Sequence, residues 1–114
     1  MIIDDEPRII SIYVRLLVES GLVARGATNA DEATDMLIRE KIDLVLLDIN
    51  MPGTDGKTMF EIIQEYDPSL KVIVASVYQL FIQKRMINKA FDYYDKSQGP
   101  SLLLDKILNA VEQG

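Results

Sequence analysis

The chain has 114 residues, 48% of them hydrophobic, and a formal net charge of −6 at pH 7. This length is enough for one domain with its own core, and we expect residues 1–114 to form that domain. The negative net charge argues against direct nucleic-acid binding, which needs a cationic face. Cysteine and histidine are both absent, which excludes disulfides, thiol catalysis and histidine acid–base chemistry. No apolar stretch is long enough to span a membrane and no signal-peptide pattern begins the chain, so we expect a cytoplasmic location.

The first half of the chain predicts strands and helices in alternation. Pro7 is placed to begin a helix, Gly21 can end it, and Asn29 is a candidate N-cap for the next helix. The predicted strands are 1–3, 22–27 and 43–48, and the predicted helices are 8–20, 30–40 and 57–66.

The second half repeats the alternation. Its predicted strands are 71–76 and 91–95, and its predicted helices are 78–90 and a last one that begins at Gly99-Pro100. The helix at 78–90 lacks a convincing cap residue at its start. Five strands alternating with five helices predict an α/β fold, a doubly wound parallel sheet with right-handed crossovers.

The stretch from Asp43 to Gly56 is the most informative. Its apolar run, Leu44 to Leu47, lacks polar alternation and suits a strand that helices cover on both faces. Asp48 follows directly, and Pro52-Gly53 then ends regular structure. Asp48 is therefore expected at the carboxyl edge of the sheet, where ligands bind in such folds. The alternative is that Asp48 only caps a turn.

The other predicted strands also end on polar residues. Asp4 and Asp5 follow the first strand, Ser76 ends the fourth, and Lys96 follows the fifth. Clustered carboxylates repel one another unless a cation joins them, and an all-oxygen site suits Mg²⁺. A carboxylate such as Asp48 can also attack phosphorus. Taken singly, each residue has a simpler explanation as a helix cap, a strand end or a surface lysine.

Four segments together carry a resemblance that covers essentially the whole chain. They are Asp4-Asp5-Glu6-Pro7, Leu46-Leu47-Asp48-Ile49-Asn50-Met51-Pro52-Gly53-Thr54-Asp55-Gly56, Ser76, and Tyr93-Tyr94-Asp95-Lys96. The chain resembles the receiver domain of bacterial two-component response regulators. The resemblance implies a flavodoxin-like sheet of five parallel strands in the order 2-1-3-4-5 with five helices. It also implies a single receiver domain at 1–114, which can be one part of a longer regulator.

The resemblance assigns roles to the residues that match the family's motifs. It makes Asp48 the phosphoryl acceptor, Asp5 a direct Mg²⁺ ligand beside Asp48, Asp4 a ligand through water, Asn50 a ligand through its backbone carbonyl, Ser76 the switch hydroxyl, Tyr93 the switch aromatic and Lys96 the phosphate-binding residue. The implied donor is a phosphohistidine on a sensor histidine kinase. The implied protein is a signalling switch rather than an enzyme, limited to self-catalysed phosphotransfer and slow dephosphorylation.

The switch is expected to act when Ser76 moves toward the phosphoryl group, which lets the Tyr93 ring turn inward. The face formed by the fourth helix, the fifth strand and the last helix then changes. An output domain or a second copy of the chain would read that face, with no direct contact to nucleic acid or membrane.

Several residues depart from the family pattern. Ser97 replaces the proline that usually follows the lysine, and Val77 replaces a small residue after the switch hydroxyl. Ser97 favours a trans peptide bond after Lys96. The interval from Ser76 to Lys96 is also shorter than usual, which predicts a short or displaced fourth helix. Lys89 stands where a glycine commonly ends that helix, so Asn88 is a candidate for the left-handed position.

These departures keep a second function open, a receiver-like binding module that works without phosphorylation. An aspartate-nucleophile phosphatase is disfavoured because it needs a second acid where this chain has Asn50. A flavin-binding module is weaker still, since no hydroxyl-rich phosphate loop follows the first strand. Phe81 could anchor a partner, but at helical spacing beside Leu80 and Ile82 we expect it in the core.

Overall fold

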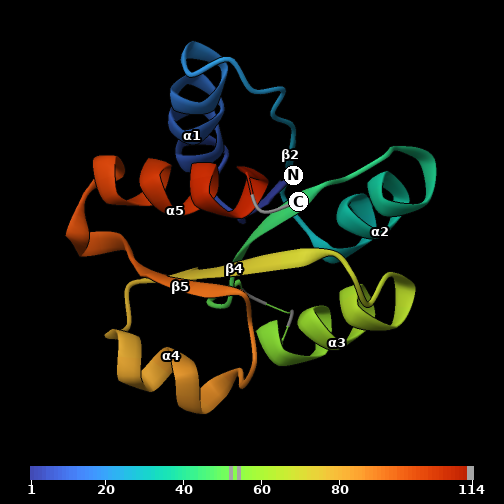
Figure 1. The fold of residues 1–114 in the computed structure, drawn as a ribbon. Helices are drawn as coiled ribbons and strands as arrows, with labels where there is room; N and C mark the ends of the chain where they lie inside the picture. Colours follow the sequence, from blue (N-terminus) through green and yellow to red (C-terminus); the bar gives the residue numbers. More distant parts are fainter. Residues whose placement is uncertain (52, 54, 113–114) are drawn as a thin grey trace.

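The computed structural model describes residues 1–51, 53 and 55–112. In this part of the chain five strands alternate with five helices, and a short 3-10 turn precedes the last helix (Figure 1). The elements are β1 (Ile2–Ile3), α1 (Pro7–Glu19), β2 (Gly26–Ala27), α2 (Ala30–Arg39), β3 (Leu44–Asp48), α3 (Gly56–Tyr66), β4 (Lys71–Ser76), α4 (Leu80–Met86), β5 (Asp92–Asp95), η1 (Lys96–Gln98) and α5 (Pro100–Glu112). None of the described helices is long and apolar enough to cross a membrane.

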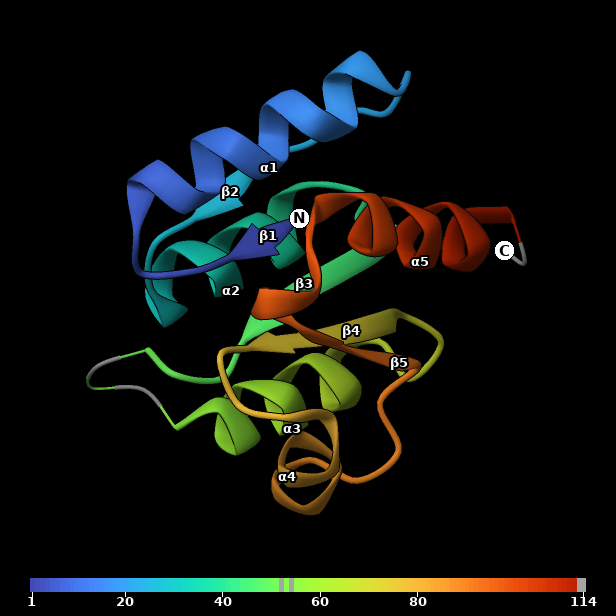
Figure 2. The same cartoon turned by 90° about the vertical axis from the view of Figure 1, so that its left-hand side faces the viewer.

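The strands form one parallel sheet in the order β2-β1-β3-β4-β5, which confirms the predicted fold. Helices α1 and α5 cover one face, and α2, α3 and α4 cover the other (Figure 1). Figure 2 shows the strands running toward the same edge. The carboxyl ends of β1, β3, β4 and β5 therefore lie along one side of the molecule.

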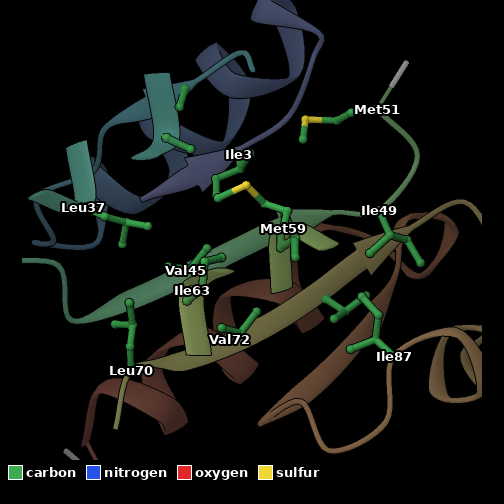
Figure 3. Close-up of a cluster of buried hydrophobic side chains, with 14 of the residues drawn as sticks. Ile3, Leu37, Val45, Ile49, Met51, Met59, Ile63, Leu70, Val72 and Ile87 are labelled. Atoms are coloured by element: carbon green, nitrogen blue, oxygen red, sulfur yellow. The ribbon is translucent and has the colours of Figure 1, made fainter. Parts of the chain in front are cut away.

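Two apolar cores lie on the two faces of the sheet, and β3 contributes to both. Val45 and Leu47 belong to the core under α2 and α3, which Figure 3 shows around Met59 and Ile63. Leu46 points the other way, into the core under α1 and α5. This alternation explains the unbroken apolar run before Asp48, because both faces of β3 are covered.

The strand β2 is shorter than the predicted 22–27, because its only neighbour is the two-residue β1. Gly26 also lies so close to α1 that an added Cβ would come within 2.2 Å of Ile10 Cγ2. The predicted N-cap of α2 is confirmed, since the Asn29 side chain accepts a hydrogen bond from Glu32 N at 2.8 Å.

Helix α4 shows the largest difference from expectation. It has seven residues instead of the predicted 78–90, in line with the short interval between Ser76 and Lys96. The prediction that Phe81 lies in the core is wrong, because its side chain is 60% exposed. The left-handed position belongs to Lys89, with φ 69°, and not to Asn88. Gln83 takes an inward position instead and is fully buried.

Candidate functional site

The first component of the site is Asp48, the last residue of β3, which is only 5% exposed. Its Oδ1 accepts a hydrogen bond from the Asn50 backbone N–H at 2.9 Å. Burial raises the pKa of the Asp48 carboxyl, although this hydrogen bond and the charge of Lys96 act in the opposite direction. The fold therefore holds a carboxyl group at the predicted edge of the sheet, and the nearby hydrogen bond and positive charge compensate only in part for its burial.

Lys96 joins two acids that are far apart in the sequence. It follows β5 directly, and its Nζ lies 2.9 Å from Asp4 Oδ2 and 3.4 Å from Asp48 Oδ2. Burial opposes the lysine charge, but the hydrogen bond to Asp4 and the charges of both acids outweigh burial, so the pKa of Lys96 is raised. Lys96 therefore remains an ammonium group between the two carboxylates.

Three acids at the end of β1 form a second cluster. Asp4, Asp5 and Glu6 each place one carboxylate oxygen within 4.8 Å of the others. Asp4 is 2% exposed, and its Oδ1 accepts a hydrogen bond from Glu6 N at 3.0 Å. An all-oxygen donor set of this kind fits a hard cation such as Mg²⁺. Asp48 lies outside this three-acid group and is connected to it through Lys96.

Ser76, the last residue of β4, is fully buried and makes two hydrogen bonds. Its hydroxyl donates to Asn50 Oδ1 at 3.1 Å and accepts from Tyr78 N, also at 3.1 Å. The hydroxyl thus links the loop after β3 to the loop after β4. Its proton is directed at Asn50 in this structure.

Tyr93 lies inside the protein, on the face of β5 that α4 covers. Its hydroxyl donates to Ile87 O at 2.6 Å and accepts from Ala90 N at 3.1 Å. The ring is 9% exposed, and Lys84 Nζ is 5.8 Å from its centroid. The ring is therefore turned inward in this structure, which is the position that the family resemblance implies for the switched form.

The turn after Lys96 is held by side-chain hydrogen bonds in place of the usual proline. The described peptide bonds are all trans. The Asp95 Oδ1 accepts from Ser97 N at 2.9 Å and from Ser97 Oγ at 2.7 Å, and Gln98 Oε1 accepts from Asp95 N at 3.2 Å. This capping box fixes the start of η1, where Lys96 lies.

The second departure from the family pattern is Val77, which directly follows Ser76. This residue is 68% exposed.

Sequence reasoning missed two residues near the site. Glu6 belongs to the acidic motif without a predicted role of its own, and its carboxylate joins those of the two preceding acids. Gln83 has one signal in the sequence, its helical spacing between Leu80 and Ile87, which both pack in the core. Pro52 and Thr54 of the motif lie outside the described residues.

Comparisons with known proteins give the family to which the chain belongs. The profile of the response regulator receiver domain matches residues 1–108. Among curated proteins, the chain is 31% identical over 77 residues to the DNA-binding transcriptional regulator NtrC of Proteus hauseri. It is 35% identical over 78 residues to the response regulator protein PilR of Pseudomonas aeruginosa. Each match covers 68% of this chain, and 16% and 18% of those relatives, so the matched segment spans less than a fifth of their length.

Two solved structures cover nearly the whole chain. A CheY-like receiver domain protein from Methanospirillum hungatei superposes with a TM-score of 0.89 at 25% identity, over 98% of this chain and 91% of the other. The response regulator TrrA from Thermotoga maritima, solved in complex with Mg²⁺ and BeF, gives 0.86 at 29% identity, over 96% and 95%. The match over residues 1–108 and the sheet order together show that the chain belongs to the response regulator receiver domain family, the signalling switches of two-component systems.

Proposed function

We propose that the chain accepts a phosphoryl group on Asp48 from a phosphohistidine of a sensor histidine kinase. The observation that carries this proposal is the position of Lys96, whose ammonium group lies between Asp48 and Asp4. This places a fixed positive charge beside a buried carboxylate, where a transferred phosphoryl group needs charge compensation. The donor imidazole has to lie outside residues 1–114, because they contain no histidine.

In the proposed step, an Asp48 carboxylate oxygen attacks the phosphorus atom of the phosphohistidine. An O–P bond forms, the P–N bond breaks, and its electron pair remains on the imidazole nitrogen. Burial raises the pKa of Asp48 and so makes its carboxylate a better nucleophile once ionised. Lys96 Nζ can then donate a hydrogen bond to a phosphoryl oxygen. Later attack by water would return Asp48 and release phosphate, without a separate phosphatase activity.

Mg²⁺ fits the acids present in this chain. Asp5 would bind it directly, Asp4 through water, and Asp48 and the Asn50 carbonyl would complete the protein ligands, with the Glu6 carboxylate close by. Bound there, the cation would supply positive charge for the phosphoryl oxygens. The chain's own contribution is to keep these oxygens at one edge of the sheet, with the Lys96 ammonium group between Asp48 and Asp4.

The proposed output follows from the residues behind the site. Ser76 would exchange its hydrogen bond with Asn50 for one with the phosphoryl group. A charge-assisted hydrogen bond is worth about 1.5–3 kcal/mol, which changes a two-state ratio by about ten- to a hundredfold. We propose that the shift alters the face of α4, β5 and α5, with Tyr93 inside it, and that an output domain or a second copy reads that face. In this proposal residues 1–114 act as one receiver domain in the cytoplasm.

Phosphorylation can be measured as a change in mass. With Mg²⁺ and acetyl phosphate, the intact protein should gain the mass of one phosphoryl group, and Asp48→Ala should abolish the gain. Asp43→Ala is the matched control, because Asp43 is an exposed acid just before β3 and its loss should leave the gain intact. Mg²⁺ binding without any mass gain would instead support the phosphorylation-independent binding module.

A further inference from the structure

Gln83 is a fully buried polar residue at the centre of α4. Its Nε2 donates one hydrogen bond to Tyr78 O at 2.8 Å and another to Tyr94 O at 2.9 Å. Its Oε1 has no hydrogen-bond partner among the described residues. Rotating the amide would bring Oε1 against two carbonyl oxygens, so the two donated bonds fix the orientation of the side chain.

The two carbonyl groups belong to the segments that hold the proposed phosphate-binding side chains. Tyr78 lies two residues after Ser76, and its backbone N–H donates to Ser76 Oγ at 3.1 Å. Tyr94 lies in β5, two residues before Lys96. Gln83 therefore bridges the loop after β4 and the end of β5 through a single amide nitrogen.

This bridge extends a hydrogen-bonded path to the loop after β3. The path runs from Asn50 Oδ1 to Ser76 Oγ and Tyr78 N, and from Tyr78 O through Gln83 to Tyr94 O. An apolar side chain would fill the same space without leaving an oxygen unpaired. The glutamine amide adds the two donors, which restrain the backbone of Tyr78 relative to β5.

We propose that Gln83 is a positioning residue for Ser76, acting through Tyr78, and this rests on the proposed function of Asp48. The Tyr78 N–H holds the Ser76 hydroxyl where its proton reaches Asn50. To approach a phosphoryl group on Asp48, Ser76 has to leave this arrangement, and Gln83 resists the accompanying movement of Tyr78. Loss of the Gln83 donors therefore favours the position of Ser76 that a phosphoryl group needs.

The test uses Gln83→Met, which keeps the length of the side chain and removes both donors. Beryllofluoride with Mg²⁺ serves as the phosphoryl analogue, and its affinity is measured by ¹⁹F NMR titration. Losing the restraint of about one hydrogen bond should tighten binding about three- to tenfold. Ile87→Val is the matched control, because Ile87 is a buried residue directly after α4 whose shortened side chain leaves these hydrogen bonds intact. Its affinity should stay at the wild-type value.

A double-mutant cycle with Ser76→Ala separates an effect of Gln83 on the position of Ser76 from a general loosening of the structure around it. If Gln83 acts through Ser76, Gln83→Met should have no effect on affinity once Ser76 is alanine. An equal effect in both backgrounds overturns the inference. Failure of the wild-type protein to bind beryllofluoride would instead count against the proposed function.

A second readout requires neither metal nor phosphoryl analogue. The Tyr78 amide donates to Ser76, so its hydrogen exchange, followed by NMR, reports how firmly this segment is held. Gln83→Met should speed exchange of the Tyr78 amide about three- to tenfold more than Ile87→Val does, since opening requires one fewer hydrogen bond to break. Equal exchange rates in the two variants would contradict a link between Gln83 and Tyr78.

Discussion

At the residue scale, the fold buries the Asp48 carboxyl group in surroundings that disfavour its charged form. Asp48 is 5% exposed and shares Lys96 with Asp4, so a single ammonium group serves two buried carboxylates. Burial is the largest influence on Asp48 and raises its pKa above the ordinary value of 3.8. The ionised carboxylate is therefore less favourable in the folded chain than in the unfolded chain.

Replacing Asp48 with its neutral isostere should stabilise the protein. At pH 7 without divalent cations, we expect Asp48→Asn to raise the free energy of unfolding by about 1 kcal/mol. A raised folded pKa gives stability that is present at low pH and is lost as the pH rises through that pKa. The advantage of the variant should therefore disappear as the pH falls to 3.8 and below. Urea unfolding at several pH values measures this, with exposed Asp105→Asn as the control. A less stable Asp48→Asn protein at pH 7 would contradict the prediction.

Lys89 is another strained position, because it adopts φ 69° just after α4. A side chain with a Cβ is unfavourable there, whereas glycine is not. Lys89→Gly should raise the free energy of unfolding by about 0.5–1 kcal/mol, after allowing for the greater freedom of glycine in the unfolded chain. Lys89→Ala removes the same charge but keeps the Cβ, so it should give no gain. Chemical denaturation measures the free energy of unfolding of both variants. Equal stability of Lys89→Gly and Lys89→Ala would assign the change to the loss of the lysine side chain and not to the backbone.

At the element scale, the start of α3 is pressed against the chain that follows Asp48. A Cβ on Gly56 would lie 2.6 Å from Ile49 Cβ and 2.7 Å from Ile49 Cα. The second of these atoms belongs to the backbone and cannot rotate away. The close approach therefore fixes the position of α3 relative to the end of β3.

Gly56→Ala should accordingly destabilise the protein by about 1–3 kcal/mol, the usual cost of overpacking. Because Ile49 is next to Asp48, the backbone shift should also reach the site and slow phosphorylation by acetyl phosphate. Lys57→Ala, at the exposed neighbouring position, should change neither property. Thermal unfolding and the mass assay test the two effects. Unchanged stability of Gly56→Ala would show that the loop can move aside at little cost.

Also at the element scale, part of the fold and of the site could be predicted from the sequence. The apolar run ending on Asp48 and the acids after β1 predicted the edge of the sheet correctly, because these signals are local. The contacts of α4 could not be predicted, since Phe81 is exposed where a core position was expected and the polar Gln83 is buried. Gln83 can be buried because its side chain donates hydrogen bonds to two backbone carbonyl groups from separate segments of the chain. A local sequence pattern does not indicate such a tertiary contact.

At the scale of the whole molecule, the edge opposite the site contains a cavity of about 810 Å³. Its apolar lining comes from α1, α5 and the segments around β2 and β3. It includes Leu17, Leu22, Ile42, Leu44, Ile107 and Val111. Met1 also lines this cavity, and its amino group donates a hydrogen bond to Leu44 O at 2.7 Å. A charged group thus lies in surroundings that favour its neutral form.

Burial lowers the pKa of this amino group from 8.0 to about 6, although the charges of Asp43 and Glu40 oppose the shift. Between these two values the unfolded chain binds more protons than the folded one, so stability should rise with pH across this window. The gain should be on the order of 2 kcal/mol. Histidine is absent, so few other groups titrate there. Urea unfolding of the polypeptide that begins at Met1, from pH 5.5 to 8.5, measures the rise. Acetylation of the amino group removes the titration and should flatten the profile, whereas a rise that survives acetylation would assign it to other groups.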